Sequence, residues 1–237
     1  MPKTDTCAFC GYTGTDFDPE HWAPKWLSRE LFPHLAKGVR HNLPYASWDA
    51  KMFQIVLPHV CKTCNGGWLS DLEKDAKPHV LPFILGNPPN PETTDLRMAL
   101  SWFFYKAISV ELGRPPEHRP THDWSVYRDF KASGLPPVPN CSLALGYREI
   151  TTTTPTFLWW GSQGLQFGSG QPGIPKIDGY HTAVLIGYVV IDVFGTGLPA
   201  KVNVQHGEGF NVAWPLPARF DWPPAKRFKD DEPMGLI

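Results

Sequence analysis

Two cysteine pairs with the same spacing constrain this chain more than any other feature of its sequence. Cys7 and Cys10 form the first CxxC pair, and Cys61 and Cys64 form the second. Two residues between cysteines allow a tight turn to direct both sulfurs at one ion, and two such turns complete a tetrahedral site. A single CxxC pair would also fit a redox motif. Because two matched pairs are present, the sequence predicts one structural Zn²⁺ held by all four cysteines.

Composition limits the classes of protein to consider. The chain has 237 residues, enough for one large domain or two small ones with a buried core. Hydrophobic residues make up 42% and charged residues 19%, the balance of a globular protein. The formal net charge is −1, and four zinc-bound thiolates would make it more negative. The whole chain therefore does not attract nucleic acid, and binding DNA would require a local patch and a bound metal.

The sequence also gives an expectation about the compartment. Residues 1–7 are too polar for a secretory signal. The longest apolar stretch, residues 183–194, is too short to span a bilayer and contains Asp192. We therefore expect a cytoplasmic protein without a membrane partner, in which cysteines bind metal rather than form disulfides.

Three regions differ in composition. Residues 1–80 contain four of the five cysteines. Residues 81–94 are rich in proline and predict a stiff joint. Residues 95–237 predict a helix followed by an antiparallel β domain, whose role the sequence does not indicate. The expected fold class is therefore α+β.

The clearest helix of the sequence follows the joint. Thr94 or Asp95 is suited to cap its first turn, and Gly113 is suited to end it. An apolar stripe at helical spacing predicts that one face is buried. Lys106 lies beside this stripe, and we expect its stem to cover the edge of the apolar face while its amine reaches water. The stripe consists of Leu96, Leu100, Phe103, Phe104, Ala107 and Val110.

Runs of β-branched and aromatic residues, separated by glycine and proline, fill the rest of the chain. No helical segment separates these runs, which predicts an antiparallel meander. Imperfect alternation within residues 180–194 predicts a strand that is buried on both faces. Cys141, which has no partner cysteine, is expected to be a small buried hydrophobic residue rather than a nucleophile. The runs are residues 141–150, 156–160, 165–167, 180–194 and 201–205.

Candidate catalytic residues lie within and just after the segment that separates the two cysteine pairs. Glu20 directly precedes His21, which can place an oxygen ligand for a metal beside a general base. Asn65 directly follows Cys64, so a bound zinc would fix its position, and its amide oxygen can be a second metal ligand. Alone, a Glu-His pair is more often a surface pair and such an Asn is often a turn former. Their combination with two cysteine pairs favours a site for phosphodiester hydrolysis.

These motifs resemble a known family. The order CxxC, then Glu-His-x-x-Pro-Lys-Trp-Leu, then Cys-Lys-x-Cys-Asn-x-Gly-Trp is similar to the zinc-binding HNH nucleases of phages and actinobacteria, and to the endonuclease VII class of HNH enzymes. The resemblance implies an N-terminal ββα-metal finger whose helix begins near Asn65. It further implies that Glu20 and Asn65 bind Mg²⁺ or Mn²⁺, that His21 is the general base, and that DNA is the substrate.

Two departures from the family pattern leave an alternative open. The acidic ligand is Glu20 where Asp is commoner, and Val56 stands where many HNH modules carry an Asn. The second hypothesis is therefore a catalytically inactive, zinc-stapled module that binds nucleic acid or another protein. A ribonuclease and a purely structural protein are further alternatives. The sequence leaves the oligomeric state open, and a homodimer would suit an enzyme that cuts both DNA strands.

Overall fold

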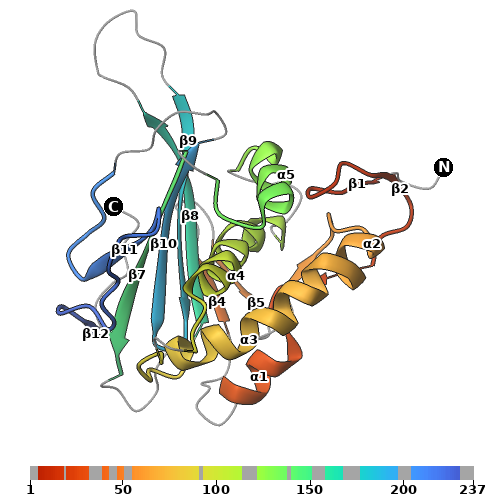
Figure 1. The fold of residues 1–237 in the computed structure, drawn as a ribbon. Helices are drawn as coiled ribbons and strands as arrows, with labels where there is room; N and C mark the ends of the chain where they lie inside the picture. Colours follow the sequence, from red (N-terminus) through yellow and green to blue (C-terminus); the bar gives the residue numbers. More distant parts are fainter. Residues whose placement is uncertain are drawn as a thin grey trace, which may run out of the picture.

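The structure is a computed structural model with mixed α and β architecture, in which helices pack on one face of a curved sheet (Figure 1). The α+β class predicted from the sequence is confirmed. No helix among the described residues is long and apolar enough to cross a membrane. The described residues are 5–18, 20–31, 39–42, 47–50, 55–90, 93–113, 122–137, 140–150, 158–167, 177–196 and 204–229.

The main sheet is largely antiparallel. Its strands follow the order β11-β7-β10-β9-β8-β4-β5, so β8, β9 and β10 form the expected meander. β4 and β5 come from the segment between the cysteine pairs, and β4 joins the sheet by a parallel pairing with β8. The strand bounds are β4 Val39–Asn42, β5 Ser47–Ala50, β7 Cys141–Glu149, β8 Leu158–Phe167, β9 Ile177–Ile186, β10 Val189–Thr196, β11 Phe210–Trp214, and β12 Phe228–Lys229, which pairs with β7.

The strand boundaries differ from the predicted runs in two places. The run at 180–194 is two strands, because Gly187 adopts a φ of 62° and turns the chain between β9 and β10. A Cβ at Gly187 would lie 2.1 Å from the Ile84 carbonyl oxygen, so only glycine fits this turn. The runs at 156–160 and 165–167 belong to the single strand β8, with residues 156–157 outside the described part. Of the run at 201–205, only Val204 and Gln205 are described, and neither is in a strand.

Helix α4, Leu96–Ser109, lies between the sheet and helix α3, Ser70–Ile84 (Figure 1). Asp95 caps α4 as expected, because its side chain accepts a hydrogen bond of 3.1 Å from the backbone N–H of Met98. The predicted apolar stripe is buried, apart from the half-buried Leu96, but burial is not limited to that face of the helix. All residues from Ala99 to Ser109 are buried, because the sheet covers one side of α4 and the N-terminal region covers the other.

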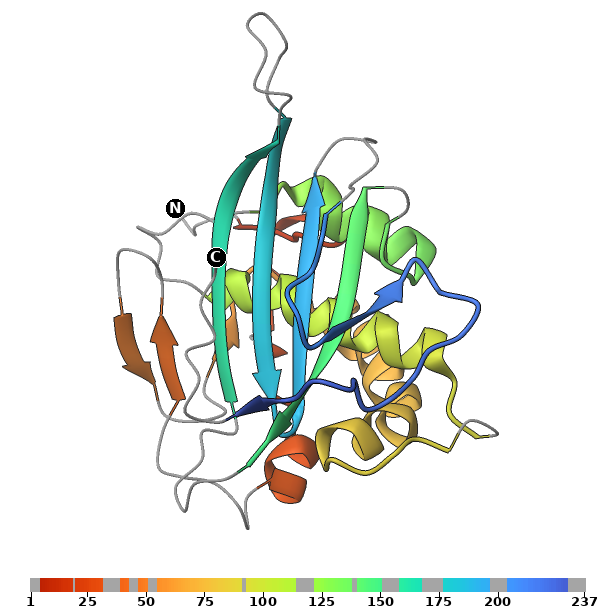
Figure 2. The ribbon, with the colours of Figure 1, turned by 90° about the vertical axis from the view of Figure 1, so that its left-hand side faces the viewer.

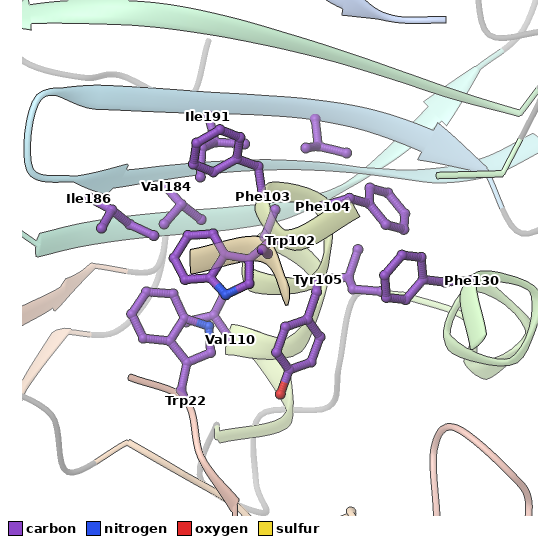
Figure 3. Packing of buried hydrophobic residues seen from close by; sticks show 14 of the residues in the cluster. Trp22, Trp102, Phe103, Phe104, Tyr105, Val110, Phe130, Val184, Ile186 and Ile191 are labelled. Atoms are coloured by element: carbon purple, nitrogen blue, oxygen red, sulfur yellow. The ribbon is translucent and has the colours of Figure 1, made fainter. Parts of the chain in front are cut away.

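Figure 3 shows this packing from close by. Phe103 is directed toward Ile191 in the sheet, whereas Trp102 and Tyr105 are directed to the opposite side of α4, where Trp22 lies. Large side chains therefore pack on both sides of the helix.

The proline-rich joint begins later than expected. Helix α3 continues through Pro78 and Pro82 to Ile84, so residues 81–84 are helical rather than part of a joint. The buried side chains Val80, Phe83 and Ile84 hold this end of α3 in the core despite the two prolines. One hydrophobic cluster extends from the cysteine region through α3 and α4 to the sheet. The division into residues 1–80 and 95–237 stays a prediction.

The remaining elements lie near the N-terminus and beside α4. Two short antiparallel strand pairs are formed, one by β1 with β2 and one by β3 with β6. A 3₁₀ turn extends α4 to Gly113, the residue expected to end this helix. Their bounds are β1 Asp5–Thr6, β2 Thr13–Gly14, β3 Glu20–His21, α1 Lys25–Leu31, β6 Val56–Leu57, α2 Lys62–Cys64 and α5 Trp124–Ser133.

Candidate functional site

The two cysteine pairs meet in space. The sulfur atoms of Cys7, Cys10, Cys61 and Cys64 all lie within 4.8 Å of one another. Tetrahedral zinc bound at about 2.3 Å by each thiolate requires sulfurs about 3.8 Å apart. The Cys10 and Cys61 sulfurs, at 3.6 Å, already match this spacing. The four cysteines could therefore hold a metal ion such as zinc.

Backbone hydrogen bonds shape this site. The N–H of Gly11 donates to the Cys7 carbonyl at 2.9 Å, and Gly11 closes the turn with a φ of 73°. The N–H of Cys61 donates to the Cys7 sulfur at 3.5 Å. The Lys131 amine donates to the Cys64 sulfur at 3.4 Å. Both contacts favour thiolates over thiols, the form that binds a metal.

Burial works against ionisation of Cys64. It raises the pKa of this thiol to about 12, with a further contribution from the charge of Cys7. A divalent cation among the sulfurs would supply the compensating charge. Metal binding at this site would therefore release the proton of the Cys64 thiol.

Two short strands, β3 and β6, pair with each other ahead of the helix near Asn65, although α1, β4 and β5 separate them in the chain. β3 pairs with β6 antiparallel, with Glu20 opposite Leu57 and His21 opposite Val56. The chain then enters α2, a π-helical turn at Asn65–Leu69, and α3. The π-helical turn contains a kink at Gly67, whose φ and ψ are not helical. The helix near Asn65 is thus present, although it is irregular where it begins.

Glu20, His21 and Asn65 line one open cleft of about 470 Å³. His21 is exposed, and Glu20 and Asn65 are half-buried. The Asn65 side-chain amide donates to the Asp18 carbonyl at 3.3 Å, which orients its nitrogen and leaves the amide oxygen as the acceptor of this side chain. The rest of the lining comes from Asp18, Ala23, Pro24, Lys25 and Ser28. The structure therefore brings the three candidate residues together.

Asp18 and Lys25 are cleft residues that the sequence analysis missed. Asp18 lies two residues before Glu20 in the sequence, and residues two apart in a strand face the same side. That spacing was a usable signal for Asp18. Lys25 begins α1 directly after Pro24; it belongs to the Glu-His-x-x-Pro-Lys-Trp-Leu motif, but no role was assigned to it from the sequence.

Glu20 lines the cleft and also interacts electrostatically with charged side chains in the protein interior. Burial raises the pKa of its carboxyl to about 7. The Lys106 amine opposes this shift, and the carboxyls of Glu73 and Asp18 add to it. An unmodified Glu has a pKa of about 4.3. Charges behind the cleft therefore act on one of its candidate metal ligands.

Lys106 is the centre of a buried polar network that the sequence analysis did not predict. Its side chain is fully buried, so the expectation that its amine reaches water is wrong. The amine forms an ion pair with Glu73 and donates to the Trp22 carbonyl at 2.6 Å. In return, the Trp22 indole N–H donates to the Lys106 carbonyl at 2.9 Å.

Two further indoles complete this network. The second oxygen of Glu73 accepts from Trp102 at 2.8 Å and from Trp26 at 3.2 Å. The Lys106 amine also lies 5.2 Å from the Trp102 ring centroid, within range of a cation–π interaction. We call this set the Lys106 cluster, and it consists of Lys106, Glu73, Trp22, Trp26 and Trp102.

A second polar cluster lies on the sheet face opposite α4, where the segment from residue 204 crosses the strands (Figure 2). One oxygen of Asp192 is 2.6 Å from His181 Nε2, and the other is 2.7 Å from His206 Nδ1. His206 Nε2 is 2.8 Å from the Ser142 hydroxyl. These four residues, the Asp192 cluster, attach the segment after β10 to the sheet.

Cys141 is fully enclosed at the start of β7. Burial raises the pKa of its thiol well above the ordinary range. The expectation of a small buried hydrophobic residue is confirmed.

No protein-family model, curated protein or solved structure matches this chain.

Proposed function

We propose that this protein is a metal-dependent HNH endonuclease that hydrolyses DNA phosphodiester bonds. One observation supports the proposal above others: Glu20, His21 and Asn65 line a single cleft although Asn65 is distant from the other two in sequence. Their meeting is what the resemblance to HNH nucleases requires. The antiparallel pairing of β3 with β6, ahead of the helix that begins near Asn65, also supports it, although α1, β4 and β5 are inserted between the two strands.

The four cysteines hold a structural zinc in this proposal. Asn65 directly follows Cys64, so the zinc site would set the position of its amide. Carboxylate and amide oxygens are the donors that Mg²⁺ and Mn²⁺ prefer, and Glu20 and Asn65 supply one of each. A bound Mg²⁺ or Mn²⁺ would stabilise the charge that develops on the phosphate and the leaving oxygen.

His21 acts as the general base. It is exposed on the cleft, so a water molecule and a phosphodiester can both reach its ring. A neutral imidazole accepts a proton from the attacking water, and the oxygen then forms a bond to phosphorus as the P–O bond to the leaving group breaks. Lys25 in the same cleft supplies a positive charge where a DNA phosphate would enter.

A plasmid-nicking assay tests the proposal. Supercoiled DNA is incubated with the purified protein and Mg²⁺ or Mn²⁺, and the open-circular product is measured. His21→Ala should lower the rate by about 10²- to 10⁴-fold, the usual contribution of a general base, without lowering the melting temperature. His79→Ala is the matched control, because His79 lies on α3 and does not line the cleft. A His21→Ala protein that nicks DNA at the wild-type rate would remove this mechanism.

The second candidate is the inactive zinc-stapled binding module. Val56 lies directly opposite His21 in the β3–β6 pairing, so no polar side chain at that position supports the imidazole. The near-neutral net charge also gives DNA little general attraction. Under this hypothesis the wild-type protein binds DNA or a protein partner, nicks nothing with either metal, and His21→Ala changes only stability.

A further inference from the structure

The residue that anchors the chain beside His21, the candidate general base, lies outside the cysteine region. β3 has only two residues, so its pairing with β6 holds the chain weakly at this point. Trp22 follows His21 directly, and all its hydrogen-bonding groups are engaged. Its backbone N–H donates to the Ile55 carbonyl at 2.9 Å, and its carbonyl and indole both bond to Lys106. Two of these three bonds come from α4.

The cost of burying Lys106 argues that the ion pair has a specific role. Removing a cation and a carboxylate from water costs several kcal/mol for each ion, and neutral residues of similar volume are often equally stable. Hydrophobic packing alone would hold α3 against α4 without Lys106 and Glu73. The charged pair additionally fixes the orientation of the Lys106 side chain, because its amine must contact both the Glu73 carboxylate and the Trp22 carbonyl.

We propose that Lys106, held by Glu73, is a positioning residue for His21. This inference rests on the nuclease function proposed above. The candidate site then has two separate supports: the cysteine site fixes Asn65, and α4 fixes the backbone that carries His21. The helix that the sequence assigned to a region of unknown role is thereby part of the active site's framework.

The test uses a double variant, Lys106→Met with Glu73→Gln. It removes both charges while keeping similar side-chain volumes, and the amide introduced by Glu73→Gln retains an oxygen that can accept from the Trp26 and Trp102 indoles. The variant should bind zinc as the wild type does and should melt within a few degrees of it. Asp192→Asn is the matched control, since it perturbs a buried ionic cluster on the far face of the sheet.

Two readouts separate positioning from general stability. The first is the NMR signal of the His21 ring, assigned by its disappearance in His21→Ala; it should shift in the double variant and stay in place in Asp192→Asn. The second is plasmid nicking, which should fall by at least about tenfold, because small misplacements of catalytic groups can cost about 10²-fold. In a His21→Ala background the same double change should cause no further loss.

Each result decides the proposal. An unchanged His21 signal overturns it whatever the nicking rate, and so does an equal loss of nicking with and without His21. If the wild-type protein nicks no DNA with Mg²⁺ or Mn²⁺, the proposed function fails, and the His21 signal alone then decides whether Lys106 positions this residue. If the double variant does not fold, Trp22→Phe replaces it. This change removes the indole N–H that donates to the Lys106 carbonyl, together with part of the buried ring, and it keeps the Trp22 backbone carbonyl that accepts from the Lys106 amine.

Discussion

The Lys106 cluster and the Asp192 cluster both place a charged side chain in the protein interior, and they lie on opposite sides of the main sheet. Each buries a charge and surrounds it with an opposite charge or with N–H donors. The Lys106 cluster encloses a cation with one carboxylate, a backbone carbonyl and indole rings. The Asp192 cluster encloses an anion with two imidazoles.

The surroundings of the two clusters differ more than their chemistry. Asp192 and its partners lie on β7, β9 and β10, whose long ladders hold them, with only His206 on a loop. The Lys106 cluster joins α3 and α4 to a chain segment that has almost no ladder of its own. A buried ion in a rigid sheet fixes a neighbouring loop. A buried ion beside a two-residue strand would, in our proposal, determine where the side chain of the candidate base His21 lies.

Removal of a metal bound by the four cysteines should have the largest effect, and it should destabilise the cysteine region far more than the main sheet. Structural zinc contributes on the order of 10 kcal/mol in small domains, and the strand pairs beside the cysteines contain two residues per strand. Chelation should therefore abolish amide-exchange protection at residues 56–65 while β9 and β10 keep theirs. Adding Zn²⁺ back is the control. Equal loss of protection throughout would show that the two regions unfold as one unit and would break the comparison.

Lys106→Met should have the next largest effect. It leaves Glu73 as a buried carboxylate without its cation, and loss of one partner of a buried pair costs about 3–5 kcal/mol. The free energy of unfolding from urea titration should fall by this amount. Adding Glu73→Gln should recover part of the loss, because the orphaned charge is then removed. If the single and double variants are equally destabilised, burial of the charge is not what makes Lys106 necessary.

How much of this arrangement the sequence predicts depends on how local its cause is. The Asp95 cap follows from residues close to one another in the chain, and it is present as expected. The cysteine site follows from two CxxC pairs that are each local although they lie far apart in the sequence, and their sulfurs do meet. The helix near Asn65, which the family resemblance implied, is also present. The turn at Gly187 was missed because apolar residues flank it on both sides, so the run looked continuous.

The two clusters were missed for a different reason. Their partners come from separate elements: Lys106 and Glu73 lie on different helices, and Asp192 and His206 lie on a strand and a later loop. A charged residue at an apolar helix position signals a buried partner, but only the fold identifies that partner. Glu20, His21 and Asn65 were named from their chemistry and their places beside the cysteine pairs, and the family resemblance then assigned their roles. That all three line one cleft was not predictable from spacing alone.

The smallest expected effect concerns Asp192. Burial alone would raise the pKa of this carboxyl, but hydrogen bonds from His181 and His206 outweigh burial and hold the pKa below its ordinary value. A carboxyl of this kind stabilises the fold at pH values above its unfolded pKa of about 3.9, and the contribution is lost as the pH falls through the lower, folded pKa. Asp192→Asn removes these charge-assisted bonds and should cost about 1.5–3 kcal/mol at neutral pH.

The pH dependence distinguishes this cluster from the Lys106 cluster. The stability difference between the wild type and Asp192→Asn should persist at about pH 5 and shrink below about pH 4, because protonation gives the wild type the same uncharged group. Acid would also protonate the cysteines and release a metal bound by them, so the measurement must be local. Amide exchange within β10 reports on the sheet without the cysteine region. A difference that is as large at about pH 3 as at about pH 5 would mean that Asp192 acts through shape rather than charge, and the two clusters would then not be electrostatic counterparts.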